Sequence, residues 1–290
     1  MSVLCLIANP VEPMFDVRLA AAIHRETGGE INWLHHGVAC DIISPKAPDP
    51  IAIARTFLGT APVDVALVPR TSRRKKLLIA DMDSTMIEQE CIDELADAVG
   101  IKPQIAAITE RAMNGELDFE AALRTRVALL KGLDRAAIEA VRREKITLTP
   151  GGRALVQTMK AYGAYTALIS GGFTFFADFF AKRIGFDEAT ANTLEFDGEM
   201  LTGTVTSPIV DKSTKLGRLK ALVDERRMWI DETLAVGDGA NDLEMIKASG
   251  LGVAFRAKPA VAAQADARVE YGDLTALLYL QGYTEDEIIR

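Results

Sequence analysis

The chain has 290 residues, of which 49% are hydrophobic and 26% are charged, and this composition is typical of a globular protein with a sizeable core. Its formal net charge of −8 at pH 7 argues against nucleic-acid binding, because phosphate backbones bind to basic surfaces. A small anionic substrate is not excluded, since a few cations can reverse the charge inside one cleft.

Three cysteines, Cys5, Cys40 and Cys91, lie far apart and include no C-x-x-C pair. This spacing predicts neither a disulfide framework nor a zinc site, and it favours a reducing compartment. The N-terminal segment lacks the basic start and apolar length of a secretory signal, and no segment approaches the roughly 20 apolar residues that span a bilayer. We therefore expect a cytoplasmic protein with no membrane contact.

The first part of the chain alternates apolar runs with helical patterns. Strands are predicted at residues 3–8, 31–36, 38–44 and 63–69, and helices at residues 16–26 and 50–58. This order predicts a small α+β ferredoxin-like domain over residues 1–72. The same order resembles amino-acid-binding regulatory modules of the ACT type, which implies serine or another amino acid as an effector. Contact in a homodimer and simple stabilisation are the alternative roles. The basic segment 70–76 is interpreted as a linker.

From Leu77 on, the pattern changes to parallel α/β structure, in which apolar runs end in Gly, Asp or Ser and are followed by helices. The clearest strands are predicted at residues 75–83, 165–172, 233–242 and 250–255. We expect an α/β, doubly wound (Rossmann-like), mostly parallel sheet over residues 73–290.

Two segments interrupt this predicted sheet. Residues 88–147 have helical patterns and are far longer than the usual connection of about two to six residues, so they are interpreted as an inserted helical cap. Residues 188–210 are rich in Thr and Val and contain the turn signal Asp197-Gly198, which predicts a β-hairpin.

The stretch LLIADMDSTMIEQE, residues 77–90, runs from an apolar strand pattern into a cluster of acids. Asp81 and Asp83 would face the same side if strand geometry persisted, and converging carboxylates are costly unless a cation or a shared proton compensates them. Asp238 and Asp242 follow a later predicted strand, and ligands bind beyond the carboxyl ends of such strands. Oxygen ligands of this kind suit Mg²⁺, although a pair of exposed loop acids is the alternative interpretation.

The second strand of this region ends in ISGG, which places Ser170 and the backbone N–H of Gly171 at a strand-to-helix turn. Such a turn is a ready anion site, although an ordinary helix cap would have the same sequence. Lys215 follows the predicted hairpin and could neutralise a phosphoryl oxygen, and Lys212 is an alternative three residues earlier. These groups predict phosphate binding.

Four motifs of the chain resemble those of a known family. The sequences DMDST, ISGG, a lysine after the predicted hairpin and GDGANDLEM occur in the order of the four motifs of the haloacid-dehalogenase-like phosphatases. Within that family, DMDSTMIEQECIDELA, FEAALRTRVALLKGL and ISGGF are most similar to the phosphoserine phosphatases. The resemblance covers roughly residues 75–275.

The resemblance implies a magnesium-dependent double displacement through an aspartyl-phosphate. Asp81 would be the nucleophile, and Asp83 the general acid and then the general base. Asp81, the backbone carbonyl of Asp83 and Asp238 would bind the metal, and Asp242 would support it. The groups implied to hold phosphate oxygens are those of Ser170, Gly171, Lys215 and Asn241.

Substrate choice would belong to the cap. Glu90 would meet an amino group of the substrate, with Glu88 as a solvated neighbour; a solvent-facing helix acid is the alternative interpretation of Glu90. Arg126 would form a bidentate pair with its carboxylate, and Arg124 is interpreted as a solvated helix charge. The apolar residues implied to close the pocket are Met113 and Phe119.

The implied reaction is hydrolysis of O-phospho-L-serine to L-serine and inorganic phosphate, the last step of L-serine biosynthesis. One alternative is another phosphatase of this fold, or a phosphotransferase that passes the phosphoryl group to homoserine. The other is a non-catalytic amino-acid sensor. The expected partner is a small phosphorylated molecule, and neither nucleic acid nor a membrane is expected.

Overall fold

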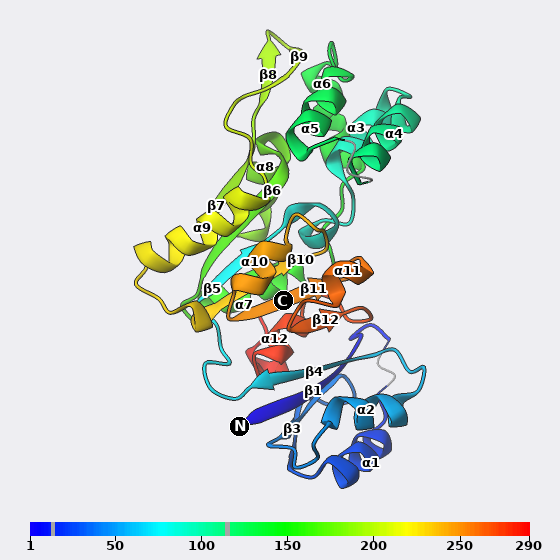
Figure 1. Cartoon of the computed structure of the whole chain (residues 1–290), viewed down its shortest axis with the longest axis vertical. Coiled ribbons are helices and arrows are strands. Elements are labelled where there is room, and N and C mark those ends of the chain that lie inside the picture. The colour runs from blue at the N-terminus through cyan, green and yellow to red at the C-terminus, as the bar shows by residue number, and fades with distance from the viewer. Residues whose placement is uncertain (13–14, 114–116) are drawn as a thin grey trace.

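The computed structural model describes residues 1–12, 15–113 and 117–290, and for Ala112 and Met113 it describes the backbone alone. An antiparallel sheet lies at one end of the molecule, a parallel sheet lies in the middle, and the cap helices lie with a hairpin at the other end (Figure 1). None of the helices in the described ranges is both long and apolar enough to cross a membrane.

The N-terminal sheet is four-stranded and antiparallel, in the order β2-β3-β1-β4. Its strands are β1 (Ser2–Ala8), β2 (Glu30–His35), β3 (Ala39–Ile43) and β4 (Val63–Pro69), and its helices are α1 (Val17–Thr27) and α2 (Pro50–Leu58). Asp16 and Asp49 accept N–H bonds from the first turns of the two helices, which fixes where each helix begins. The ferredoxin-like prediction is confirmed.

Alternation along β1 gives this sheet two apolar faces. Leu4 and Leu6 pack with residues of α1 and α2 in one core cluster. Val3 and Cys5 belong instead to the large core that also contains Leu277 of α12 (Ala276–Leu280). The N-terminal sheet is therefore covered on both faces, and one of the covers belongs to the C-terminal part of the chain.

The central sheet has six parallel strands in the order β12-β11-β10-β5-β6-β7. They are β5 (Leu77–Ala80), β6 (Tyr165–Phe173), β7 (Glu188–Asn192), β10 (Thr233–Gly237), β11 (Leu251–Phe255) and β12 (Ala267–Val269). The helices beside it are α7 (Gly152–Ala161), α8 (Thr174–Ile184), α9 (Lys212–Glu225), α10 (Leu243–Ala248) and α11 (Pro259–Ala262). Short helical turns are η1 (Met82–Met86), η2 (Ile230–Glu232) and η3 (Glu285–Glu287).

Helices cover both faces of the central sheet. Leu78 packs in the core that contains residues of α7, α8 and α12, whereas Ile79 packs in the core that contains residues of α9 and α10. This two-sided burial is the reason that the strands are continuous apolar runs. The prediction of a doubly wound α/β fold is confirmed.

In the part of the connection between β5 and β6 that the structure describes there are four helices. They are α3 (Cys91–Ala98), α4 (Lys102–Met113), α5 (Phe119–Ala128) and α6 (Arg135–Glu144). The segments that lead into and out of this group pair with each other. Ile87 forms a β-bridge with Leu148, and the Thr149 N–H donates to the Met86 carbonyl at 3.1 Å. Entry and exit thus form one narrow connection between the cap helices and the central sheet.

Residues 188–210 do not form one hairpin, so this prediction is partly wrong. The first five residues are β7, which pairs in parallel with β6 at the sheet edge. The hairpin consists of β8 (Leu194–Asp197) and β9 (Met200–Val205), with Gly198 at positive φ in the turn. Leu201 exchanges backbone hydrogen bonds with the loop after α5, which ties the hairpin to the cap helices.

The interpretation of residues 70–76 as a simple linker is also wrong. The Arg73 guanidinium donates to both carboxylate oxygens of buried Asp41, at 2.6 and 2.7 Å, and to the Leu280 carbonyl. The Lys75 ammonium donates to the Asp231 carbonyl at 2.6 Å. These basic residues are fixed in the structure because their partners come from distant parts of the chain.

Candidate active site

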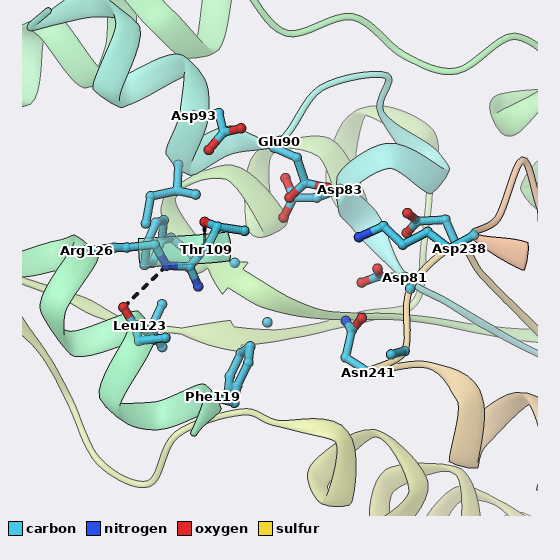
Figure 2. Close-up of a pocket in the computed structure, with 18 of the residues that line it drawn as sticks. Asp81, Asp83, Glu90, Asp93, Thr109, Phe119, Leu123, Arg126, Asp238 and Asn241 are labelled. Carbon is cyan, nitrogen blue, oxygen red and sulfur yellow. Dashed lines mark hydrogen bonds between the residues drawn. The ribbon is translucent and has the colours of Figure 1, made fainter. Parts of the chain in front are cut away.

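A cavity of about 730 Å³ lies between the carboxyl ends of the central strands and the cap helices. Figure 2 shows Asp81, Asp238 and Asn241 on the side of the central sheet, and Glu90, Phe119 and Arg126 on the side of the cap. Residues from both parts of the fold therefore face one space.

Asp81 and Asp83 do not point the same way, because strand geometry ends between them. The Asp81 N–H still donates to the Val236 carbonyl of β10, at 3.0 Å. The chain then makes the turn η1, in which Ser84 has φ of 54°. Asp81 lies in the group with Asp238, whereas Asp83 lies beside Glu90 (Figure 2). The turn gives the two carboxylates different surroundings.

Lys215 lies at the buried end of the site. It is 0% exposed, and its Nζ lies 2.5 Å from Asp81 Oδ1 and 2.6 Å from Asp242 Oδ1. Burial opposes the charged ammonium, but the two carboxylates more than offset this and raise the pKa of Lys215. Lys212 is exposed and faces Glu244 at 3.5 Å, so Lys215 is the lysine that reaches the site.

Three carboxylates could hold a metal ion. Oxygens of Asp81, Asp238 and Asp242 all lie within 4.8 Å of one another. Burial, and then the Asp242 carboxylate, raises the pKa of Asp81, and the same two causes raise the pKa of Asp238 to about 6. One ammonium does not balance three carboxylates, and hard oxygen ligands suit a divalent cation such as Mg²⁺, so the residues fit the metal.

Asp242 has both oxygens engaged by protein. Oδ1 accepts from Lys215, and Oδ2 accepts from the Gly239 N–H at 3.1 Å. A Cβ on Gly237 would lie 2.5 Å from Asp242 Oδ2, so the close approach of this carboxylate requires glycine there. Asp81 and Asp238 are therefore better placed than Asp242 to bind a metal directly.

Asp83 accepts hydrogen bonds at both oxygens. The Cys91 N–H donates to Oδ1 at 3.0 Å, and the Ser170 hydroxyl donates to Oδ2 at 3.3 Å. Burial raises the pKa of Asp83, and the contacts with Cys91 oppose this rise. A carboxyl group that is neutral more of the time can serve as a proton donor.

The segment ISGG lies within β6 rather than at the first turn of α8, because the strand continues to Phe173. Ser170 is fully buried, whereas Gly171 lines the cavity. A Cβ on Gly171 would lie 3.1 Å from the Phe119 ring, so this glycine lets Phe119 approach the strand. The structure thus brings Gly171 and Phe119 together at the cavity wall.

Glu90 and Arg126 give the cap side opposite charges. Glu90 accepts from the Ser84 hydroxyl at 2.7 Å, and the surrounding protein, followed by Asp83, raises the pKa of Glu90 to about 7. Arg126 is partly buried, which lowers its pKa, and its Nη1 lies 3.4 Å from the Thr109 hydroxyl. A zwitterionic ligand could bind between them.

The other predicted cap residues differ in what can be said of them. Arg124 pairs with Glu120 and donates to the Ser207 hydroxyl, so its guanidinium is engaged near the hairpin. Asn241 lines the cavity beside the acidic cluster. The side chain of Met113 lies outside the described residues.

Comparisons with known proteins agree on one family. The model of the haloacid dehalogenase-like hydrolases matches residues 78–247. A phosphoserine phosphatase of Streptomyces coelicolor is 38% identical over 99% of this chain and 72% of that relative. A probable phosphoserine phosphatase of Schizosaccharomyces pombe is 48% identical over 74% of this chain and 73% of that relative. The chain belongs to the haloacid dehalogenase-like hydrolase family.

One solved structure is similar to this protein over nearly the whole chain. The unliganded crystal structure of a probable phosphoserine phosphatase from Vibrio cholerae has a TM-score of 0.81 at 32% identity, with 99% of this chain and 88% of that chain covered. The similarity therefore includes the N-terminal sheet. The resemblance predicted from the sequence motifs is confirmed.

Several cavity residues of this haloacid dehalogenase-like hydrolase were not predicted. Lys258 follows β11 and lines the cavity, and its N–H donates to the Asp238 carbonyl at 3.2 Å. Its position at a strand end is a signal that could have identified it. Asp93 and Thr109 also line the cavity, but they come from cap helices whose packing no local pattern specifies. Gly172, the last residue of ISGG, has no role in the sequence analysis, although it lies against Asp83.

Proposed function

We propose that this haloacid dehalogenase-like hydrolase is a magnesium-dependent phosphatase that hydrolyses O-phospho-L-serine to L-serine and inorganic phosphate, the last step of L-serine biosynthesis. The observation that carries the proposal is one cavity in which Asp81 and the acidic cluster face Glu90 and Arg126. A site for phosphate chemistry thus lies opposite a site for an amino acid. The names of the curated relatives support the same substrate.

In the first step, Asp81 attacks phosphorus in line and forms an aspartyl-phosphate as the bond to the serine oxygen breaks. Asp83 gives its proton to that leaving oxygen. In the second step, Asp83 takes a proton from water as the water oxygen attacks phosphorus, the bond between phosphorus and Asp81 breaks, and phosphate is released. Both Asp81 and Asp83 are buried enough for their pKa values to be raised, and Lys215 holds Asp81 in place through a 2.5 Å contact.

Mg²⁺, bound by Asp81, Asp238 and the backbone carbonyl of Asp83, would supply positive charge to the phosphoryl oxygens. Asp242 would act indirectly, because its oxygens hold Lys215 and the Gly239 N–H. The remaining phosphate contacts are assigned to Ser170, Gly171, Lys215 and Asn241. The Ser170 hydroxyl is buried behind the cavity wall and donates to Asp83. To bind phosphate, it would exchange this hydrogen bond for one with a phosphate oxygen.

The cap would select the amino acid. Glu90 would bind the ammonium of phosphoserine, and Arg126 would bind its carboxylate in a bidentate pair. Phe119 and Met113 would close the pocket and exclude water. In this proposal the N-terminal domain comprises residues 1–72 and the phosphatase core comprises residues 73–290. The cap is the insertion of about residues 88–147.

Phosphate release from a panel of phospho-amino acids and sugar phosphates tests the substrate. We expect phosphoserine to be the best substrate, activity to disappear on chelation of Mg²⁺ and to return when Mg²⁺ is added, and Asp81→Asn to be inactive. Fast turnover of a sugar phosphate with none of phosphoserine would contradict the substrate assignment. The same assay with homoserine as an acceptor distinguishes hydrolysis from phosphoryl transfer.

An amino-acid effector at the N-terminal domain is a second, separate proposal. It is supported by a cavity of about 640 Å³ whose walls include His35 of β2, Arg153 of α7 and Arg290. Calorimetry of serine binding to the full chain tests it, with Arg153→Ala as the variant expected to lose binding. Homodimer formation and a cytoplasmic location also remain proposals, and light scattering of the purified protein tests the first.

A further inference from the structure

The N–H of Cys91 makes a contact that no role assigned above uses. It donates to Oδ1 of Asp83 at 3.0 Å across eight positions of sequence. Cys91 is the first residue of α3, and α3 is the first helix of the cap. The proposed acid-base carboxylate is therefore bonded directly to the cap.

The helix needs this contact as much as the carboxylate does. The first N–H groups of a helix have no partner within the helix and are usually satisfied by a capping side chain. Glu90 occupies the cap position of α3, but its side chain makes no capping bond and accepts from Ser84 instead. Asp83 thus satisfies the N-terminus of α3, and its negative charge lies at the positive end of the helix dipole.

The other side of Asp83 is fixed by the central sheet. Oδ2 accepts from the Ser170 hydroxyl, whose oxygen accepts in turn from the Gly172 N–H at 2.8 Å. A Cβ on Gly172 would lie 2.6 Å from Asp83 Oδ2, so the carboxylate occupies space that only glycine leaves free. Asp83 is held between β6 of the sheet and α3 of the cap.

We propose that the Cys91 N–H is a positioning group for catalysis, which holds the Asp83 carboxylate in the orientation required for proton transfer. Because Cys91 belongs to the cap, proton transfer then depends on the position of the cap relative to the central sheet. The proposal rests on the acid-base role of Asp83 in the proposed function. With Oδ1 occupied by the Cys91 N–H, the proton leaves from Oδ2 to the serine oxygen as the phosphorus–oxygen bond breaks and the bond from Asp81 to phosphorus forms. In hydrolysis, Oδ2 takes a proton from the attacking water.

Proline at position 91 removes this N–H, together with the Cys91 thiol that also contacts Asp83, with little change to the helix. Proline is well tolerated at the first position of a helix, because the N–H that it lacks has no partner within the helix. The preceding residue, Glu90, is already extended, with φ of −89° and ψ of 112°, as a residue before proline must be. Cys91→Ala is the matched control, since it keeps the N–H and removes the thiol.

The test compares Cys91→Pro with Cys91→Ala on two substrates. With phosphoserine, we expect kcat of Cys91→Pro to be lower by roughly tenfold or more, with KM within about twofold, since general acid catalysis contributes ~10²–10⁴. With p-nitrophenyl phosphate, the rate of the first burst of nitrophenolate should be the same in both variants, because this leaving group departs without a proton. A purely structural defect would slow both substrates.

Asp83→Ala separates the two levels of the proposal. It should lose turnover of phosphoserine and keep the nitrophenolate burst. If it affects both substrates alike, the acid role in the proposed function is wrong. If Asp83→Ala discriminates between the substrates but Cys91→Pro matches Cys91→Ala on both, the positioning role of Cys91 is overturned.

Hydrogen exchange gives a readout that does not depend on whether Cys91→Pro folds. In Asp83→Ala, we expect faster amide exchange in the first turn of α3, while exchange in α8 stays as in the parent. Unchanged protection of the Cys91 amide would show that the contact does not hold the helix, and it would overturn the proposed coupling.

Discussion

Lys215 is a buried cation that lies between two buried carboxylates, Asp81 and Asp242. Removal of one member of such a group leaves uncompensated charge in a medium that solvates it poorly. We expect Lys215→Met to lower the free energy of unfolding by about 3–5 kcal/mol in the absence of Mg²⁺, as measured by urea denaturation.

Lys212→Met is the matched control for this prediction, because Lys212 is exposed and its contact with Glu244 is 3.5 Å long. An exposed ion pair contributes about 0–1 kcal/mol. Equal losses for the two variants would show that the contacts of Lys215 do not stabilise the fold.

The proposed contact between Glu90 and the substrate ammonium predicts that substrate binding depends on pH. The pKa of Glu90 is raised from 4.5 to about 7 by the protein that surrounds its carboxyl group on the cavity side and then by Asp83, which favours the neutral form of Glu90 below about pH 7. A neutral carboxyl group binds ammonium weakly. We therefore expect kcat/KM for phosphoserine to fall as pH falls through 7, since kcat/KM reports the free enzyme.

Glu90→Gln tests the assignment of this pH dependence. It should lower kcat/KM at pH 8 through KM, and it should remove the part of the profile centred near pH 7. A profile in Glu90→Gln that keeps the same midpoint would mean that another group titrates there.

At the scale of single elements, the hairpin β8–β9 supports the cap through Gly203. This glycine has φ of 86°, and a Cβ there would lie 3.0 Å from the Cβ of Lys131 and 3.4 Å from the Cα of Ala128 in α5. Because α5 carries Arg126, we expect Gly203→Ala to raise KM for phosphoserine and to cost more than about 2 kcal/mol of stability, from backbone strain and the close contact together.

Gly198 offers a control in the same hairpin. It also has positive φ, but a Cβ there would meet nothing within 4 Å. Gly198→Ala should cost about 1 kcal/mol from backbone strain alone and leave KM unchanged. If the two substitutions have the same effect on KM, contact between the hairpin and α5 does not shape the substrate site.

Site residues that directly follow a parallel strand were predictable from the sequence. Asp81 and Asp238 come together because parallel strands end at one edge, and a period-two or apolar pattern locates such strands. The η1 turn was not predictable. Ser84 has a positive φ there, but a serine in the sequence does not signal positive φ as a glycine would. β12 has three residues, too few for a pattern, and β7 was assigned to the hairpin because its Thr and Ala residues fit either element.

At the scale of the whole molecule, the N-terminal sheet is anchored to the catalytic unit by buried charges. Asp64 of β4 accepts N–H groups of Glu270, Tyr271 and Gly272, at 2.8 to 3.2 Å for the shortest contact with each. Arg73 bridges Asp41 and the carbonyl of Leu280. No local signal reveals these contacts, because each joins residues more than thirty positions apart. An independently moving regulatory domain would not need them.

These anchors predict that the chain unfolds as one cooperative unit. In a Trp229→Phe background, fluorescence of Trp33 reports the N-terminal sheet, and enzyme activity reports the catalytic unit. We expect the two signals to be lost at the same urea concentration.

Arg73→Met leaves Asp41 buried without its cation and should lower the free energy of unfolding by about 3–5 kcal/mol, and it should shift both signals together. The exposed neighbour is the control. Arg74→Met removes a surface pair worth about 1 kcal/mol or less and cation–π contacts with Tyr162 and Tyr283 worth about 0.5–1 kcal/mol each at an exposed site. Separate transitions in the parent protein would show that the sheet folds independently, and its anchoring contacts would then not couple the two parts.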